Sequence, residues 1–156
     1  MTAKATTTIG APVSKVWEAL TKPEIIKQYF FGTDTITDWK IGSPVIWKGE
    51  WEGKTYEDRG VVLDLKPNKL ISFTYWSSMS GKEDRPENYA TVTYELRDHD
   101  RNTEVSVTQS NVADEKTKQH SEQNWNMVLE NLKKLLEKQE PNMPSVKKDS
   151  PGRQIL

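Results

Sequence analysis

The feature that most constrains the fold is the stretch from Asn124 to Leu136, NWNMVLENLKKLL, where apolar residues recur three and four positions apart. Residues at these spacings share one face of an α-helix, so the pattern predicts an amphipathic helix over residues 114–139. Toward the N-terminus the same stripe continues with polar residues: Ser121, Lys118 and Thr117. We therefore expect this helix to close a core at its C-terminal end and to wall a cavity at its N-terminal end. The apolar stripe consists of Trp125, Val128, Leu129, Leu132, Leu135 and Leu136.

Length and composition indicate one domain. The 156 residues carry 22 basic and 23 acidic side chains, so the net charge of -1 gives no general attraction to nucleic acid or anionic lipid. No cysteine is present, which excludes disulfides and thiolate ligands. The N-terminus lacks the apolar run of a signal peptide, and no stretch approaches the roughly 20 apolar residues that span a bilayer. We expect a cytoplasmic protein that neither binds nucleic acid nor inserts into a membrane. One domain is expected over residues 1–140, followed by a mobile tail over residues 141–156.

The rest of the sequence predicts a strand, two short helices and then a series of strands. Residues 2–9 alternate weakly, and Pro12 and Pro23 stand where helices start, because proline needs no backbone N–H there. Over residues 34–110 apolar residues recur at every second position, which indicates about six strands with one wet face. Such a sheet needs a cover, and the long helix can provide it, so the fold class is α+β. The predicted inward positions are Val45, Trp47 and Trp51; Val61, Leu63 and Leu65; Ile71, Phe73 and Tyr75; Ala90, Val92, Tyr94 and Leu96; Val105 and Val107.

Four segments carry family motifs: APVSKVWEALTKPE at residues 11–24, GVVLDLKPNKLISFTYW at 60–76, TEVSVTQ at 103–109 and HSEQNWNMVLENL at 120–132. Together they resemble the activator-of-heat-shock-protein-90-ATPase-like family of the START and birch-pollen-allergen-like helix-grip (SRPBCC) superfamily. The resemblance implies a helix-grip fold, in which a curved antiparallel sheet wraps around the long C-terminal helix and a cavity, with two short helices after the first strand. Relatives often have glycine where this chain has Asn124, which puts a polar amide near the cavity.

Catalytic groups are scarce. His99 lies in a charged turn and His120 lies early on the long helix. Without cysteine these two residues make no recognisable zinc site, and the glycines match no phosphate-binding loop. A general base near neutral pH is most often a histidine or a buried carboxylate, and the strand pattern turns no carboxylate clearly inward. We therefore predict no catalysis, no metal and no cofactor.

The six tryptophans are the strongest functional signal. Trp17 and Trp125 lie on regular apolar helical stripes, which is typical of core residues. Trp47, Trp51 and Trp76 lie on strands that also carry polar residues, which favours a partly apolar pocket. We predict that an apolar or aromatic small molecule, lipid-like or polyketide-like, binds between the sheet and the long helix. The candidate cavity residues are Tyr29, Phe31, Trp39, Trp47, Trp51, Tyr75, Trp76, Tyr89, His120, Ser121, Asn124, Trp125 and Val128.

Two other functions stay open. The family resemblance also implies a protein-interaction module that stimulates the ATPase of a chaperone, with the loop at residues 77–87 and the charged strands as the contact surface. The superfamily further houses cyclase-like and hydratase-like enzymes, for which Tyr29, Asn124 or His120 would supply polar groups. A polar cavity would favour an enzyme, an apolar cavity a carrier, and a filled interior an interaction module.

Overall fold

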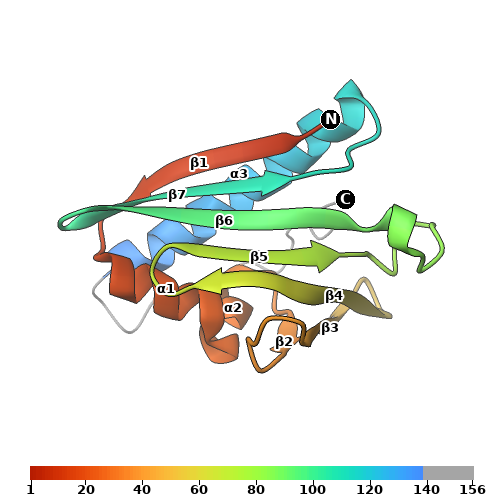
Figure 1. Cartoon of the computed structure of the whole chain (residues 1–156), viewed down its shortest axis with the longest axis horizontal. Helices are drawn as coiled ribbons and strands as arrows, with labels where there is room; N and C mark the ends of the chain where they lie inside the picture. Colours follow the sequence, from red (N-terminus) through yellow and green to blue (C-terminus); the bar gives the residue numbers. More distant parts are fainter. Residues whose placement is uncertain (139–156) are drawn as a thin grey trace.

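The computed structural model describes residues 1–138, which form an open, curved, seven-stranded antiparallel sheet with three helices on one face (Figure 1). The strand order is β1-β7-β6-β5-β4-β3-β2. This arrangement confirms the predicted α+β fold with two short helices after the first strand. The predicted tail, residues 141–156, and residues 139 and 140 of the predicted domain lie outside the described residues. The elements are β1 (Ala3–Ile9), α1 (Val13–Thr21), α2 (Pro23–Tyr29), β2 (Asp34–Ile36), β3 (Pro44–Trp51), β4 (Lys54–Lys66), β5 (Leu70–Tyr75), a 3-10 helix (Pro86–Asn88), β6 (Ala90–His99), β7 (Asn102–Gln109) and α3 (Glu115–Glu137).

The helices begin at the start signals in the sequence. Pro12 precedes α1 and Pro23 is the first residue of α2, where the missing N–H of proline costs no hydrogen bond. Asp114 caps α3, because its Oδ1 accepts a hydrogen bond from the backbone N–H of Thr117 at 2.8 Å. Within residues 1–138, no helix is long and apolar enough to cross a membrane.

The apolar stripe of α3 packs on the sheet, as its spacing predicts. The indole N–H of Trp125 donates to Oε1 of Gln109 on β7 at 2.8 Å, which ties the helix to the sheet inside the core. Ser121, on the predicted polar extension of the stripe, is fully buried and does not wall an open cavity. The central residues of the stripe are at most 2% exposed: Trp125, Val128, Leu129 and Leu132.

Charged side chains of α3 cover the edge strand β1. Glu137 accepts a hydrogen bond from the backbone N–H of Gly10 at 2.7 Å. Lys133 donates to the backbone oxygen of Thr8 at 2.8 Å and to Glu137 at 2.6 Å. These contacts satisfy backbone groups at an edge that would otherwise be free to pair with another strand. A further contact of this kind joins Lys4 and Glu122.

The predicted inward face of β4 is wrong at Val61 and Leu63 and right at Leu65. Val61 and Leu63 are 39% and 44% exposed, whereas Val62 is 1% exposed. The cause is a β-bulge directly after Val62, where the pairing with β5 shifts by one residue. Side chains alternate between the two faces of a strand, so a shift of one residue changes the face on one side of the bulge only. Leu65, beyond the bulge, packs against the core as predicted, whereas Val61 and Leu63 face outward. The residues turned toward the helices instead are Tyr56, Asp58, Gly60 and Val62.

Gly60→Ala should destabilise the fold strongly. A Cβ on Gly60 would overlap the carbonyl oxygen of Thr74 and lie 2.7 Å from its carbonyl carbon, and this main-chain group cannot move aside. We expect the free energy of unfolding, measured by urea titration, to fall by about 2–3 kcal/mol. The matched control is Gly10→Ala, whose Cβ would meet only the flexible side chain of Glu137 at 3.2 Å. Equal losses in the two variants would contradict this explanation.

Glu137 should contribute stability that depends on pH. Hydrogen bonds from Lys133 and from the backbone of Gly10 lower the pKa of its carboxyl below 4.5. A group whose folded-state pKa is lowered stabilises the fold above its unfolded-state pKa, and this contribution is lost as the pH falls through the folded-state value. Urea melts should show the wild type more stable than Glu137→Gln at neutral pH and equal to it in strong acid. The side chain is 34% exposed, so added salt should shrink the difference.

Candidate functional site

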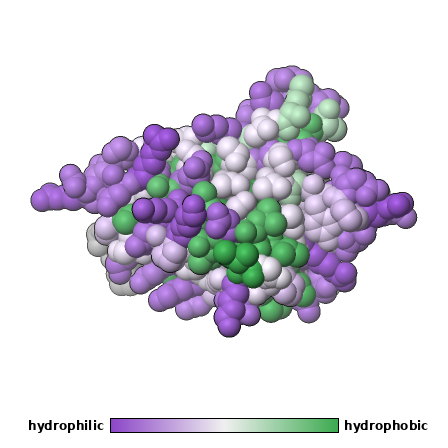
Figure 2. All heavy atoms as spheres, in the orientation of Figure 1, coloured by the Kyte–Doolittle hydropathy of each residue, from purple (hydrophilic) through white to green (hydrophobic). Residues whose placement is uncertain are grey.

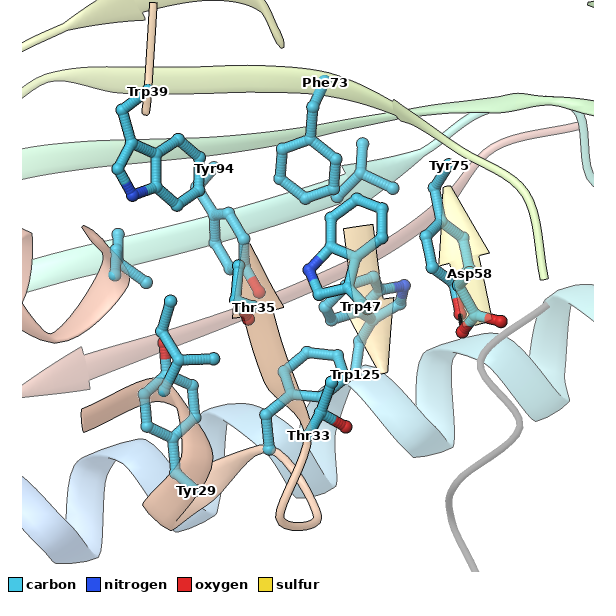
Figure 3. Close-up of a pocket in the computed structure, with 14 residues that line it drawn as sticks. Tyr29, Thr33, Thr35, Trp39, Trp47, Asp58, Phe73, Tyr75, Tyr94 and Trp125 are labelled. Atoms are coloured by element: carbon cyan, nitrogen blue, oxygen red, sulfur yellow. Dashed lines mark hydrogen bonds between the residues drawn. The ribbon is translucent and has the colours of Figure 1, made fainter. Parts of the chain in front are cut away.

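A small cavity lies between the sheet and the helices, toward the β2 to β5 side (Figure 3). Its volume is about 40 Å³. All three helices and the strands from β2 to β6 contribute to its wall, which is mainly aromatic and aliphatic. The lining residues are Leu20, Ile26, Tyr29, Phe30, Thr33, Thr35, Trp39, Trp47, Asp58, Phe73, Tyr75, Val92, Tyr94 and Trp125.

Aromatic rings contact one another around the cavity. The ring centroid of Trp47 lies 5.1 Å from that of Tyr75 and 5.3 Å from that of Phe73. Tyr94 meets Trp125 edge to face, with centroids 5.9 Å apart and ring planes at 90°. Such pairs add to the stabilisation that burial provides and hold the rings in defined orientations. The wall formed by β3, β5, β6 and α3 is therefore well packed.

Thr35 is the buried polar residue of the wall that has no partner. Its Oγ1 is inaccessible to solvent and makes no hydrogen bond within the described part of the chain. A buried hydroxyl without a partner costs free energy, and native proteins usually satisfy such an atom with an ordered water or a ligand. Figure 3 shows the Tyr94 hydroxyl directed into the same region of the cavity as Thr35. This end of the cavity therefore offers hydrogen-bonding groups inside an apolar wall.

The tyrosines at this end are neutral hydrogen-bonding groups. Burial raises the pKa of Tyr29 and of Tyr94 above the usual value of 10.0, and the charged form of Tyr29 is further disfavoured by the nearby Tyr94. The Tyr29 hydroxyl donates to the backbone oxygen of Ala19 at 2.7 Å. Both phenols remain protonated at neutral pH, so neither acts as a base.

The expectation that no carboxylate turns inward is wrong, because Asp58 is fully buried in the cavity wall. Its Oδ2 accepts a hydrogen bond from the Tyr75 hydroxyl at 2.7 Å. Its Oδ1 accepts hydrogen bonds from the backbone N–H and the hydroxyl of Ser78 at 2.9 and 3.1 Å. Both oxygens thus hold β5 and the loop that follows it. Among residues 1–138, no group of three or more histidine or acidic side chains is placed to hold a metal ion.

The structure brings five of the thirteen predicted site residues together at the cavity. They come from α2, from the loop after β2, from β3 and β5, and from α3. The Trp39 indole is fixed there by a hydrogen bond to the backbone oxygen of Thr21 at 2.7 Å. The five residues are Tyr29, Trp39, Trp47, Tyr75 and Trp125.

The other eight predicted residues lie outside the cavity lining. His120 is exposed, and its Nε2 lies 3.1 Å from Nδ2 of Asn124, one turn further along α3. The Trp76 indole donates to the backbone oxygen of Lys82, so it is held by the loop after β5. Tyr89 donates to Asp84 in the same loop. Two more are buried in the contact of α3 with the rest of the fold, Ser121 and Val128, and the last two are half-buried, Phe31 and Trp51.

Sequence reasoning missed several lining residues for identifiable reasons. Phe73 and Tyr94 lie on faces that were correctly predicted to point inward, so the strand period could have assigned them. Thr33 and Thr35 flank a single residue at the start of β2, and a three-residue strand is too short to show a period. Asp58 was missed because the bulge in β4 reverses the inward face.

An open groove of about 740 Å³ lies next to the cavity. It is formed by the β3–β4 hairpin and by the loop after β5. Its lining has polar and apolar surface in similar amounts, whereas that of the cavity is mainly apolar. The lining residues are Lys48, Gly49, Lys54, Thr55, Tyr56, Glu57, Ser78 and Met79.

Comparison with known proteins assigns the family. Residues 10–137 match the model of the family described as Activator of Hsp90 ATPase homolog 1-like protein. The chain belongs to this family. The match confirms the resemblance seen in the sequence motifs. Among curated proteins, none matches this sequence.

Solved structures similar to this member of the Activator of Hsp90 ATPase homolog 1-like family share its fold. The protein ChR145 from Cytophaga hutchinsonii is 50% identical, with 88% of this chain and 94% of that chain covered and a TM-score of 0.78. The Aha1 dimer from Colwellia psychrerythraea is 23% identical, with 88% and 96% covered and a TM-score of 0.69. DynU16, a protein of the dynemicin biosynthetic locus, is 19% identical, with 90% and 48% covered and a TM-score of 0.74. The last two similarities concern the fold alone.

Thr35→Val should stabilise the free protein, although it removes a buried polar group. The substitution keeps the shape of the side chain and deletes a hydroxyl that has no partner. The free energy of unfolding from urea melts should therefore rise by about 1 kcal/mol. Thr33→Val is the matched control, because the Thr33 hydroxyl is buried and bonded to the Tyr56 hydroxyl at 2.7 Å. That variant should lose about 1–2 kcal/mol, and a loss in both variants would contradict the assignment of Thr35 as unpaired.

Proposed function

We propose that this protein binds an apolar or aromatic small molecule in the cavity, without catalysing a reaction. The unpaired Oγ1 of Thr35, in a wall that is otherwise mainly aromatic and aliphatic, carries the proposal. Small-molecule sites typically combine an apolar wall with a few placed polar groups. Asp58, the carboxylate of the lining, has both oxygens engaged in structural hydrogen bonds and is not poised as a base. His120, the other candidate base, is exposed and outside the lining.

The wall chemistry favours an uncharged ring system with one polar substituent. Among residues 1–138, no lysine, arginine or histidine lines the cavity, so an anionic group would be desolvated there without a partner. Thr35 and Tyr94 each offer a hydroxyl that can donate or accept a hydrogen bond. A polyketide-like or lipid-like molecule with a hydroxyl, carbonyl or amine in its apolar part meets these requirements.

The cavity must widen to take such a ligand. Drug-sized ligands occupy pockets of roughly 300–1,000 Å³, whereas this cavity measures about 40 Å³ and has room for a few water molecules only. Binding is therefore expected to move side chains of the wall. Aromatic rings fill most of the interior in this structure, which by the criterion given above also favours an interaction module.

Binding should be detectable by tryptophan fluorescence with a neutral aromatic probe, N-phenylnaphthylamine. The probe should quench or shift the emission, because the indoles of Trp39, Trp47 and Trp125 line the cavity. Thr35→Val should raise the Kd of the probe about twofold to tenfold by removing the hydroxyl that accepts its N–H. The matched control is Thr6→Val on β1, which is remote from the cavity and should bind as the wild type does. Failure of the wild type to saturate below millimolar probe would overturn the proposal.

A second candidate function is interaction with a chaperone. Exposed apolar residues on the outer face of the sheet favour it. Ile36 on β2 and Val61 and Leu63 on β4 are 51%, 39% and 44% exposed. Figure 2 shows hydrophobic residues gathered near the middle of this face. Exposed apolar groups on a sheet face favour contact with another protein.

The test of this second candidate uses a purified chaperone ATPase of the Hsp90 type. In the interaction hypothesis, added protein increases the rate of ATP hydrolysis, and Leu63→Ser reduces that increase while leaving probe binding in the cavity intact. The control is Ile26→Val, a conservative change in the cavity wall, which should leave the stimulation unchanged. No stimulation at saturating protein would remove this candidate.

A further inference from the structure

The closed cavity and the open groove meet at two hydrogen-bonded pairs. Thr33 lines the cavity and Tyr56 lines the groove, and their hydroxyls lie 2.7 Å apart. Asp58 lines the cavity and Ser78 lines the groove, and Oδ1 of Asp58 accepts two hydrogen bonds from Ser78. These four residues separate the two spaces, and we refer to them as the partition.

The weakest point of the partition is the Thr33–Tyr56 pair, which joins two neutral hydroxyls. Elsewhere the wall consists mainly of aromatic and aliphatic side chains packed in the core, and moving them apart exposes apolar surface to water. The bond between the Thr33 and Tyr56 hydroxyls can be replaced by hydrogen bonds to water from the groove, so its net contribution is small, whereas the bonds to the Asp58 carboxylate are stronger. Ser78 also lies in a connecting loop, where motion disrupts less packing than in a strand.

Gly49 keeps the partition closed by leaving room for Tyr56. A Cβ on Gly49 would overlap the Tyr56 hydroxyl and lie 2.5 Å from its Cζ. The phenol ring therefore rests against a position without a side chain, directly across the β3–β4 pairing. Any side chain at position 49 would push the ring away from its bond with Thr33.

The charge of the groove indicates which end of a ligand it receives. Alternation along the paired strands places the Lys54 side chain of the lining on the face of Tyr56, whereas the Lys48 side chain and the Glu57 carboxylate lie on the opposite face. That carboxylate is already shared between Lys48 at 3.8 Å and Arg59 at 3.2 Å. Lys54 thus presents a cation beside Tyr56, whereas no lysine, arginine or histidine among residues 1–138 lines the cavity.

We propose that the groove and the cavity are two halves of one binding site, joined when the partition opens. The ligand class is an amphipathic aromatic acid, with its rings in the cavity and its anionic end beside Lys54 in the groove. The opened partition also supplies the space that the closed cavity lacks. This inference rests on the proposed binding function and adds the route of access and the orientation of the ligand.

The experiment compares two probes with the same rings, neutral N-phenylnaphthylamine and anionic anilinonaphthalene sulfonate, by stopped-flow fluorescence on the full chain. Thr33→Val and Gly49→Ala loosen the partition, and Thr33→Ser keeps its hydroxyl. In the first two variants we expect the association and dissociation rate constants of both probes to rise together by about twofold to tenfold. Thr33→Ser should stay near the wild type, and urea melts verify that each variant is folded.

The orientation is tested with Lys54→Gln. This variant should raise the Kd of the sulfonate probe about twofold to fivefold at low salt, and should change the Kd of the neutral probe less. Added salt should remove the difference. An equal effect on both probes, or none on either, would overturn the placement of the anionic end in the groove.

The outcomes separate this inference from the binding proposal. If neither probe binds the wild type below millimolar concentration, the proposed function itself fails. If the probes bind but their rate constants are the same in the wild type, Thr33→Val and Gly49→Ala, the cavity is reached elsewhere and the inference is overturned. The inference is also overturned if the rate constants rise in Thr33→Ser as much as in Thr33→Val. Thr33→Ser keeps the hydroxyl, so the lost hydrogen bond would not explain the faster rates.

Discussion

The packing of α3 on the sheet is the interaction on which the rest of the structure depends. Its apolar stripe forms the centre of the core, and the Trp125 indole both bonds to Gln109 on β7 and lines the cavity. Two further aromatic residues, Phe30 and Tyr94, meet that indole edge to face at 6.2 and 5.9 Å. At the far edge, the charged face of α3 satisfies the backbone of β1. Helix α3 thus covers the core, forms a wall of the cavity and protects one edge of the sheet.

Stability and binding make opposite demands on the space beside this helix. A core of aromatic rings gains from being filled, and the cavity is indeed reduced to about 40 Å³. The unpaired hydroxyl of Thr35 opposes that trend, since an apolar side chain of the same shape would suit a closed core better. The polar partition of Thr33, Tyr56, Asp58 and Ser78 reconciles the two demands, because it closes the interior with bonds that water can replace.

Family membership explains the scaffold and leaves the function to particular side chains. The Activator of Hsp90 ATPase homolog 1-like match covers residues 10–137, and proteins only 19% and 23% identical share the fold. A fold of this kind can carry different sites, so the choice between a ligand and a protein partner depends on local chemistry. Thr35 in the cavity favours a ligand, while Val61 and Leu63 on the outer face favour a partner.

The sequence by itself determined the elements whose periodicity is long and regular. The stripe of α3, the inward faces of β5, β6 and β7, and the helix starts at Pro12 and Pro23 all follow from local spacing and are found in the structure. Tertiary structure alone decided which aromatic residues meet at the cavity, because this depends on which strands become neighbours. It also decided the face of β4, where a bulge after Val62 reverses the alternation and turns Asp58 inward. Periodicity carries information only while the pairing register is unbroken, and a bulge is defined by the partner strand rather than by the residues that form it.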